Sequence, residues 1–279
     1  MDSSTKPVVV RQVWASNLES EFALLEQILP CYCHVAFDTE FPGFIHVSEK
    51  NCHYSKLPPS YTYKLVKANV DSLKLIQLGL ALSNYAGHLP DLGTDSYYVW
   101  EFNFKGLDVD RDHHNPDAIQ LLAEQGIDFA QIKEEGIPIG AFRRLFLRSR
   151  FMFSRLNLTW VTFHSTYDFG YMVKVLTGRK LPNDLDVFKV VVSELFGSSV
   201  YDMKHMIKFC RGINVGGLEK LAKSLKVDRV AGNSHQAGSD SLLTIQTFFK
   251  LRDLYFTADN CDEQDCLNIN SFVNILFGL

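Results

Sequence analysis

A short apolar segment near the N-terminal end of the chain carries two acids. Residues 35–41 read V-A-F-D-T-E-F and run into Pro42-Gly43, a pattern typical of a strand that ends in a turn. Asp38 and Glu40 are two residues apart, so on a strand their side chains point to the same side. Such a pair repels unless a cation lies between the carboxylates, and hard divalent ions prefer carboxylate oxygens. The segment is therefore a candidate metal edge, although a D-x-E facing water on an exposed strand explains the same residues.

The pattern along the rest of the chain predicts a mixed α/β sheet. Strands at residues 72–82 and 96–103 would complete an antiparallel meander with residues 35–41, and residues 159–163 would add a buried parallel strand. A chain of 279 residues suits one domain over residues 1–279, with the tail from residue 257 packed back on it. Helical spacing and helix-boundary residues predict helices at 17–28, 61–68, 118–125, 128–134, 139–149, 167–176, 185–196, 217–225 and 239–256.

Charge and cysteine content narrow the class of protein. The net charge of -4 argues against coating nucleic acid through bulk electrostatics, so any nucleic-acid site would be local. No apolar run reaches the roughly 20 residues that span a bilayer, and the N-terminus lacks a signal peptide's apolar stretch, so we expect an intracellular protein without a membrane partner. The 6 cysteines show no C-x-x-C spacing, which favours reduced thiols in the cytoplasm or nucleus. A zinc site from Cys31, Cys33 and His34 is a minor alternative, because the cluster lacks a second half.

Two further acids lie where helices are expected to begin. Asp168 falls in the first turn after the strand at 159–163, and Asp240 follows His235 by five residues ahead of the last long helix. Each acid alone is explained by the helix dipole, which favours a negative charge at a helix start. Together, three acid-bearing segments with apolar or aromatic flanks fit two-metal phosphoryl chemistry, which needs two ions about 3.5 to 4 Å apart.

These motifs resemble a known family. F-D-T-E-F-P-G, H-S-T-Y-D-F-G-Y and H-Q-A-G-S-D-S-L-L-T resemble the three exonuclease motifs of the DEDDh superfamily, specifically those of the Caf1/Pop2 poly(A) deadenylases, catalytic subunits of the CCR-NOT complex. Intervening stretches such as W-E-F-N-F and G-G-L-E-K-L-A also match, so the resemblance covers nearly the whole chain, and the plant members are nearest in overall character. It implies a ribonuclease-H-like (DnaQ-type exonuclease) α/β fold, with a mixed central sheet flanked by helices. It also implies a 3′-to-5′ exoribonuclease that removes poly(A) tails from messenger RNA and releases 5′-AMP.

The resemblance assigns a role to each of the residues above. Asp38, Glu40, Asp168 and Asp240 would hold two divalent ions, Mg²⁺ or Mn²⁺. His235 would be the general base that activates water, a role that suits an imidazole whose pKa is near neutral.

One more acid, Asp202 in Y-D-M-K, also follows an apolar run. We rank Asp240 above it as a metal ligand, because the H-x-x-x-x-D spacing supplies base and ligand together. Asp202 is expected to lie behind the ligands and to orient a neighbour through hydrogen bonds.

Binding of the RNA and of partner proteins completes the expectations. Phe41, Phe44, Phe169 and Tyr171 flank the acidic motifs and are candidates for stacking on a single-stranded 3′ end, although core packing explains at least half of them. The preference for adenine is implied by the resemblance alone. So are docking on the Not scaffold subunit and on the leucine-rich-repeat nuclease subunit of the complex.

Three other functions stay open at this point. The first is an inactive nuclease-fold scaffold, and the second is a DEDDh exonuclease that acts on another RNA or on DNA. The third is a structural helical module, which the strand-borne D-T-E disfavours.

Overall fold

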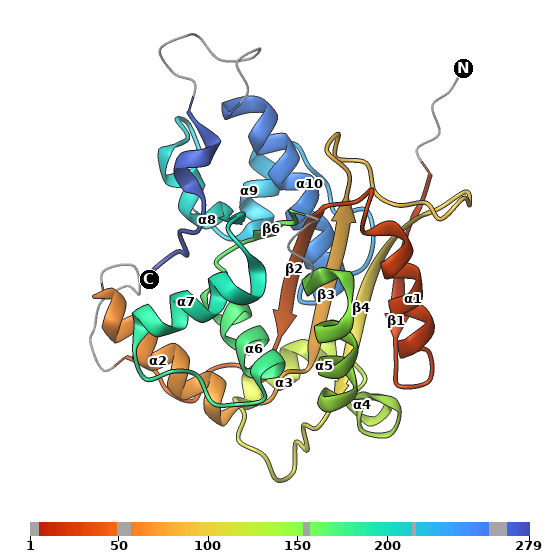
Figure 1. Cartoon of the computed structure of the whole chain (residues 1–279). Coiled ribbons are helices and arrows are strands. Elements are labelled where there is room, and N and C mark those ends of the chain that lie inside the picture. The colour runs from red at the N-terminus through yellow and green to blue at the C-terminus, as the bar shows by residue number, and fades with distance from the viewer. Residues whose placement is uncertain (1–5, 49–56, 153–156, 214–215, 257–266) are drawn as a thin grey trace.

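The computed structural model describes residues 6–48, 57–152, 157–213, 216–256 and 267–279. One sheet runs through it in the order β1-β4-β3-β2-β6-β7, with β5 paired to the end of β4. Figure 1 shows β1, β4, β3, β2 and β6 side by side in this order. The central strands β2, β3 and β4 form the predicted antiparallel meander, whereas β1, β6 and β7 pair in parallel with β4, β2 and β6. The strands are β1 (Val8–Val13), β2 (His34–Glu40), β3 (Gln77–Ser83), β4 (Tyr97–Lys105), β5 (Ile137–Pro138), β6 (Thr159–Thr162) and β7 (Val200–Asp202).

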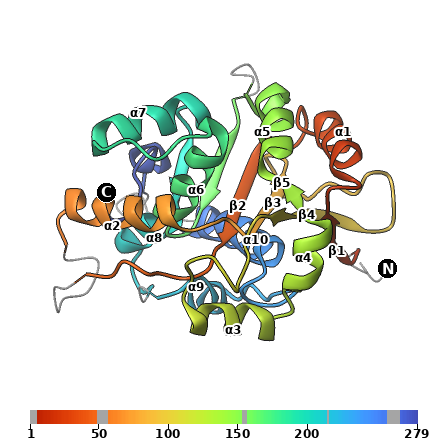
Figure 2. The same ribbon diagram turned by 90° about the horizontal axis from the view of Figure 1, so that it is seen from below.

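Helices cover both faces of this sheet. Viewed from below, α1, α5, α6 and α7 lie on one side, and α9 and the long α10 lie on the other (Figure 2). None of the helices in the described part of the chain is both long and apolar enough to cross a membrane. The helices are α1 (Leu18–Ile28), α2 (Pro59–Ser72), α3 (Pro116–Glu124), α4 (Phe129–Glu135), α5 (Ile139–Arg148), α6 (Thr166–Thr177), α7 (Leu185–Phe196), α8 (Met203–Met206), α9 (Leu218–Ser224) and α10 (Ala237–Tyr255).

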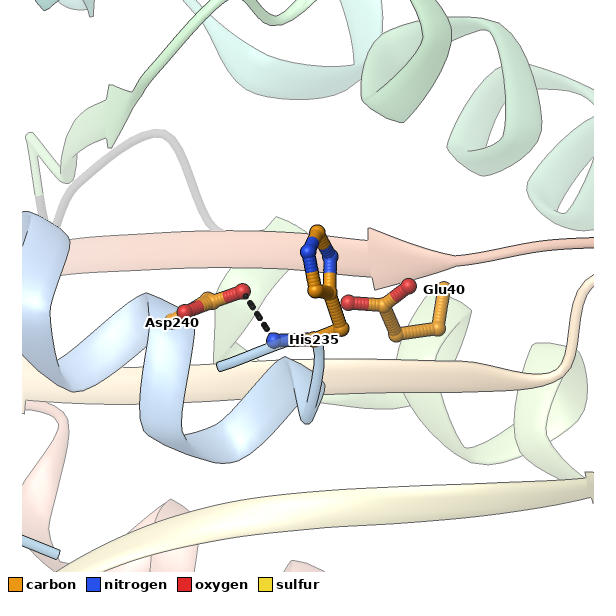
Figure 3. Close-up of side chains that lie close together, drawn as sticks. All are labelled: Glu40, His235 and Asp240. Atoms are coloured by element: carbon orange, nitrogen blue, oxygen red, sulfur yellow. Dashed lines mark hydrogen bonds between the residues drawn. The ribbon is translucent and has the colours of Figure 1, made fainter. Parts of the chain in front are cut away.

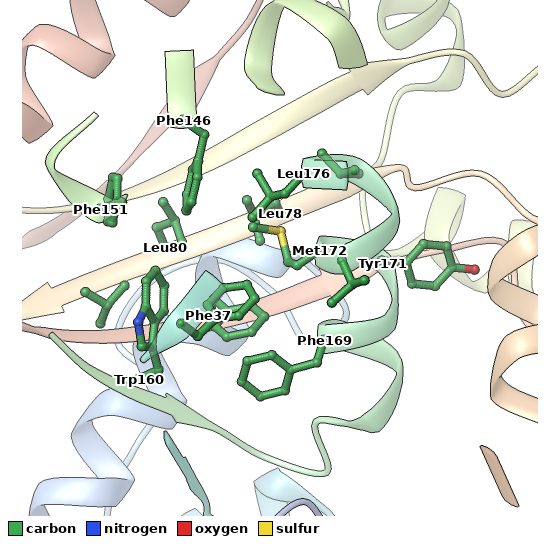
Figure 4. Close-up of a cluster of buried hydrophobic side chains, with 14 of the residues drawn as sticks. Phe37, Leu78, Leu80, Phe146, Phe151, Trp160, Phe169, Tyr171, Met172 and Leu176 are labelled. Carbon is green, nitrogen blue, oxygen red and sulfur yellow. The ribbon is translucent and has the colours of Figure 1, made fainter. Parts of the chain in front are cut away.

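Alternation along β2 assigns its side chains to the two layers. Phe37 packs edge-on against Trp160 and Phe169, with ring centroids 5.7 and 5.0 Å apart, in the core under α5 and α6 (Figure 4). Ala36 belongs to the second core, which α10 covers. Because the side-chain period of a strand is two, Asp38 shares the α10 face with Ala36. The two acids of β2, which are two residues apart, therefore lie on the face of the sheet that α10 covers.

Several sequence predictions of elements were wrong or incomplete. The strands β1, β5 and β7 were missed, because β5 and β7 are only two and three residues long and β1 joins an edge of the sheet through pairing with distant β4. The helix expected at 61–68 is the longer α2, which begins with Pro59 in its first turn, where the missing N–H costs no hydrogen bond. As a result β3 begins at Gln77 and not at residue 72.

The described part of the tail packs back as expected. The N–H of Asn274 donates to the carbonyl oxygen of Val200 at 2.8 Å, and Ile275 forms a bridge with Tyr201 in β7. Residues 257–266 of the predicted tail lie outside the described residues. That residues 1–279 form one domain stays a prediction.

Candidate active site

Close packing of α10 on the sheet brings the last acid to the first two. Gly79 pairs with Asp38 across β3 and β2, and a Cβ on Gly79 would lie 1.8 Å from the carbonyl oxygen of Ala237. Only glycine allows the first turn of α10 to sit this near the strand. The buried carboxylate of Glu101 accepts a hydrogen bond of 2.8 Å from the N–H of Gly238, which satisfies a free donor of the helix start. Asp240, in the same first turn of α10, consequently faces the acids of β2.

The resulting cluster joins two carboxylates and an imidazole. Possible ligand atoms of Glu40, His235 and Asp240 all lie within 4.8 Å of one another, and Figure 3 shows the His235 ring between the two carboxylates. The backbone N–H of His235 donates to Oδ2 of Asp240 at 3.0 Å. His235 has a φ of 60°, in the left-handed region that non-glycine residues rarely adopt. A strained conformation held by the site's own carboxylate is typical of a functional loop.

The third acid is attached to β2 directly. Oδ1 of Asp168 accepts hydrogen bonds from the backbone N–H of Thr39 at 2.9 Å and from its Oγ1 at 2.6 Å. Thr39 is the residue between Asp38 and Glu40, so these bonds fix the first turn of α6 beside the pair. The three segments singled out in the sequence therefore meet at one place.

The electrostatics of this place favour added positive charge. Burial raises the pKa of Asp38 well above its ordinary value, and the charges of Asp168, Asp240 and Glu40 raise it further. Burial and the charges of Asp240 and Asp168 do the same to the pKa of Glu40, and burial raises the pKa of Asp168 to about 7. Burial also raises the pKa of Asp240, against the opposing effect of Arg229. Carboxylates that repel one another at this density match the ligand set of hard divalent ions, so the residues present fit such ions.

Asp202 lies apart from the cluster and has different partners. It is fully buried, and its carboxylate accepts hydrogen bonds from the backbone N–H groups of His164, Ser165, Lys204 and Phe277 at 2.9 to 3.1 Å. The Ser165 hydroxyl adds a bond of 2.8 Å. These bonds join the end of β7 to the turn before α6 and to the C-terminal segment. They leave Asp202 little capacity to bind an ion.

Replacing Asp202 with alanine is therefore expected to lower stability and not to abolish ion binding. The substitution leaves buried N–H donors without an acceptor, which should cost roughly 3 kcal/mol or more of unfolding free energy. Urea unfolding measures this loss, and thermal unfolding with and without Mg²⁺ measures ion binding. If Asp202→Ala removed the ion-dependent stabilisation while Asp240→Ala preserved it, the ranking of the two acids would be reversed.

The aromatic candidates divide into two groups. Phe169 and Tyr171 are 0% and 1% exposed, and their rings lie in the core (Figure 4), so the expectation that they stack on bases is corrected. Phe44 is 44% exposed, and Phe41 is partly buried. Both contact Tyr167, with ring centroids 4.9 and 5.5 Å away. We call Phe41, Phe44 and Tyr167 the aromatic platform.

Sequence reasoning missed three residues that shape the site. Tyr167 could have been found from its place directly before Asp168. Thr39 could have been found between the two acids of β2. Arg229, which contacts Asp240, has no motif or spacing that would mark it.

The zinc alternative finds no support in the structure. Burial lowers the pKa of His34 to about 4, and its ring packs against Tyr85 and Phe249 with centroids 5.2 Å away. Among the residues that the structure describes, the group that gathers metal-ligand atoms is Glu40, His235 and Asp240.

Comparison with known proteins identifies relatives over most of the chain. The CAF1 family ribonuclease profile matches residues 13–139 and 153–248. The "Probable CCR4-associated factor 1 homolog 7" of Arabidopsis thaliana is 42% identical over 273 residues, which cover 98% of this chain and 94% of that protein. The "Poly(A) ribonuclease pop2" of Schizosaccharomyces pombe is 38% identical over 247 residues, which cover 88% and 70%.

Solved structures give the same picture. S. pombe Pop2p in its Mg²⁺ and Mn²⁺ bound form superposes with a TM-score of 0.82 at 36% identity, over 98% of this chain and 100% of that one. The chain in a structure of the yeast NOT1 MIF4G domain co-crystallised with CAF1 gives 0.74 at 28% identity, over 99% of each chain. E. coli exonuclease I, at 15% identity and 0.51 over 78% of this chain and 40% of that one, shares the fold alone. The predicted ribonuclease-H-like fold is thereby confirmed.

Proposed function

The chain belongs to the CAF1 family of ribonucleases, and from this premise we propose that it is a 3′-to-5′ exoribonuclease that shortens poly(A) tails of messenger RNA and releases 5′-AMP. The observation that carries the proposal is the meeting of four acids from three distant segments beside an exposed imidazole. An inactive scaffold would have no need of acids that repel one another at this density, because they lower its stability.

The acids have a role as ligands in this proposal. Asp38, Glu40, Asp168 and Asp240 would hold two divalent ions, Mg²⁺ or Mn²⁺. Such ions, when bound, lower the pKa of water and neutralise charge that develops on a phosphate. Divalent ions are supported by the similar Pop2p, which has been solved with Mg²⁺ and Mn²⁺ bound.

His235 would act as the general base. Its imidazole lies between Asp240 and Glu40, where it can accept the proton of the attacking water at a ring nitrogen (Figure 3). Its exposure leaves that nitrogen open to solvent, to which the proton is then passed. The hydrogen bond from its own backbone N–H to Asp240 holds the loop beside the acids.

The substrate is tested with two RNAs that differ only in their tails. Each carries a 5′ label and ends in about twenty adenosines or uridines, and each is incubated with Mg²⁺, Mn²⁺ or a chelator. The proposal predicts stepwise shortening from the 3′ end that requires the ion and prefers adenosine. Equal shortening of both tails would favour an exonuclease for another substrate, and no shortening with either ion would favour the scaffold.

The aromatic platform is expected to hold the RNA end. Stacking contributes about 1–3 kcal/mol per base, so Phe44→Ala or Tyr167→Ala should lower kcat/KM on the adenosine tail by about tenfold or more. A matched control is Tyr85→Ala, which removes a ring that is 70% exposed but packs on His34. Unchanged kcat/KM in both platform variants, measured beside this control, would show that the aromatic platform does not bind the RNA.

The proposal also covers the protein partners of the chain and its location in the cell. We propose docking on the Not scaffold subunit, supported by the similar CAF1 chain solved with the NOT1 MIF4G domain. Association with the leucine-rich-repeat nuclease subunit and residence in cytoplasm and nucleus rest on the family resemblance. Co-purification with a purified NOT1 MIF4G domain tests the first of these, and its absence at micromolar protein would contradict it.

A further inference from the structure

The guanidinium of Arg229 lies against one of the proposed ion ligands. Its Nη2 is 2.5 Å from Oδ1 of Asp240 and 2.5 Å from Oε1 of Glu219, to which Nε also donates at 2.8 Å. Its Nη1 donates to Oγ of Ser239 at 2.5 Å and to the carbonyl oxygen of Asn233 at 3.3 Å. The side chains of Arg229 and Asp240 are 14% and 12% exposed, so this pair is largely shielded from water, whereas Glu219 is 42% exposed.

The loop that carries His235 is held at both of its ends by these contacts. Arg229 precedes the loop, Asn233 lies within it, and Ser239 and Asp240 follow it at the start of α10. Oδ1 of Asp240 is held by Arg229, and Oδ2 is held by the N–H of His235. Both carboxylate oxygens thus have a fixed direction, which a planar guanidinium fork imposes better than the single charge of a lysine.

The charge of Arg229 has a second consequence. A guanidinium stays protonated at all relevant pH values, so Arg229 is a permanent positive charge at the edge of four acids. At low exposure such a charge offsets part of the repulsion between them. Glu219, on α9, holds the guanidinium from the other side and so sets its position.

We propose that Arg229 is a positioning residue that fixes Asp240 and the His235 loop, and that it serves as the resident positive charge of the acidic site when no divalent ion is bound. This inference rests on the proposed ion-binding function. It predicts that an added ion partly replaces the charge of Arg229 but does not replace its geometry.

Arg229→Met removes both the positive charge and the forked guanidinium, and it leaves a side chain of similar length. The loss of thermal stability against the unaltered protein is expected to be larger in chelator than in saturating Mg²⁺, because bound ions supply the missing charge. At saturating Mg²⁺, kcat should fall by about tenfold or more with KM changed less than about threefold, as for other residues that orient ligands. Arg229→Lys keeps the charge, so it should recover most of the stability in chelator and little of the kcat.

The matched control is Arg11→Met on the opposite face of the sheet. Arg11 also pairs with a buried acid, with its Nε 2.7 Å from Oε2 of Glu21, and its loss should lower stability equally with and without Mg²⁺. If Arg229→Met does not fold, Glu219→Gln, which loosens the guanidinium, is expected to show the same signatures in weaker form.

Each result has one meaning. Equal losses of stability for Arg229→Met in chelator and in Mg²⁺ would overturn the charge role, and unchanged kcat would overturn the positioning role. If the unaltered protein itself gained no stability from Mg²⁺, the proposed function would fail. If it gained stability while Arg229→Met behaved like Arg11→Met, the inference alone would fail.

Discussion

Replacing Asp38 with asparagine is expected to abolish activity and, in chelator, to make the protein more stable. The amide has nearly the shape of the carboxylate but carries no charge, so it is a poor ligand for a hard divalent ion. Loss of residues that only orient such ligands costs about 10- to 100-fold, and loss of a ligand should exceed about 100-fold in kcat/KM. The pKa of Asp38 is raised by burial and by three neighbouring acids, so removing its charge relieves repulsion in the folded state.

Two measurements on one variant separate this account from simple damage to the fold. Damage would lower both activity and melting temperature, whereas loss of one ion ligand and its charge should abolish activity and leave the melting temperature in chelator at or above that of the unaltered protein. The control is Asp186→Asn, which neutralises an exposed acid in the first turn of α7 and should leave activity intact. An active Asp38→Asn protein would exclude Asp38 as a ligand.

Without ions, the protein is expected to lose stability as pH rises from about 4 to about 7, and Mg²⁺ is expected to restore it. Burial raises the pKa of Asp168 to about 7, and the pKa values of Asp38 and Glu40 are raised as well. In this pH range these acids lose their protons at a lower pH in the unfolded chain than in the folded chain. The stability contributed by the protonated acids is therefore complete at low pH and is lost on the way to neutrality, by on the order of 3 kcal/mol between pH 5 and 7.

Urea unfolding at pH 5 and pH 7, in chelator and in Mg²⁺, measures this linkage. At an ion concentration of about 100 times Kd, binding to the folded state should return about 2.7 kcal/mol at pH 7. Asp38→Asn should flatten the pH profile in chelator and remove much of the Mg²⁺ effect. A profile in chelator that rises between pH 5 and 7, together with no response to Mg²⁺, would contradict an acidic site that binds divalent ions.

The positions of the acids could be predicted because local rules fix them. The alternation of V-A-F-D-T-E-F places Asp38 and Glu40 on one face of β2, and helix-start positions place Asp168 and Asp240 at element ends. Such rules act within a few residues of sequence. That these segments meet was inferred from the chemistry of their acids and from the family resemblance. No local pattern reveals it, because it depends on contacts such as Gly79 against Ala237.

What sequence reasoning missed depends on long-range pairing and on the face of a helix. The strand β1 carries Arg11 and Gln12 between its valines, and its parallel partner β4 lies about ninety residues away, so no local signal predicts the pairing. On α6, Phe169 and Tyr171 are in the core while Tyr167 is only partly buried. Which face of α6 is buried is decided by Phe37 and the rest of the sheet, and not by α6 itself.

Exonuclease action at the 3′ end is tested by identifying the nucleotide that is released from a labelled adenosine tail. RNA carrying the label within its tail is incubated with the protein and Mg²⁺, and the small products are separated by chromatography over time. The expected result is 5′-AMP as the sole small product, released from the first time point, absent in chelator and absent with Asp38→Asn. Release of 3′-phosphorylated or cyclic products, or of longer fragments before mononucleotides, would contradict an ion-dependent exonuclease acting from the 3′ end.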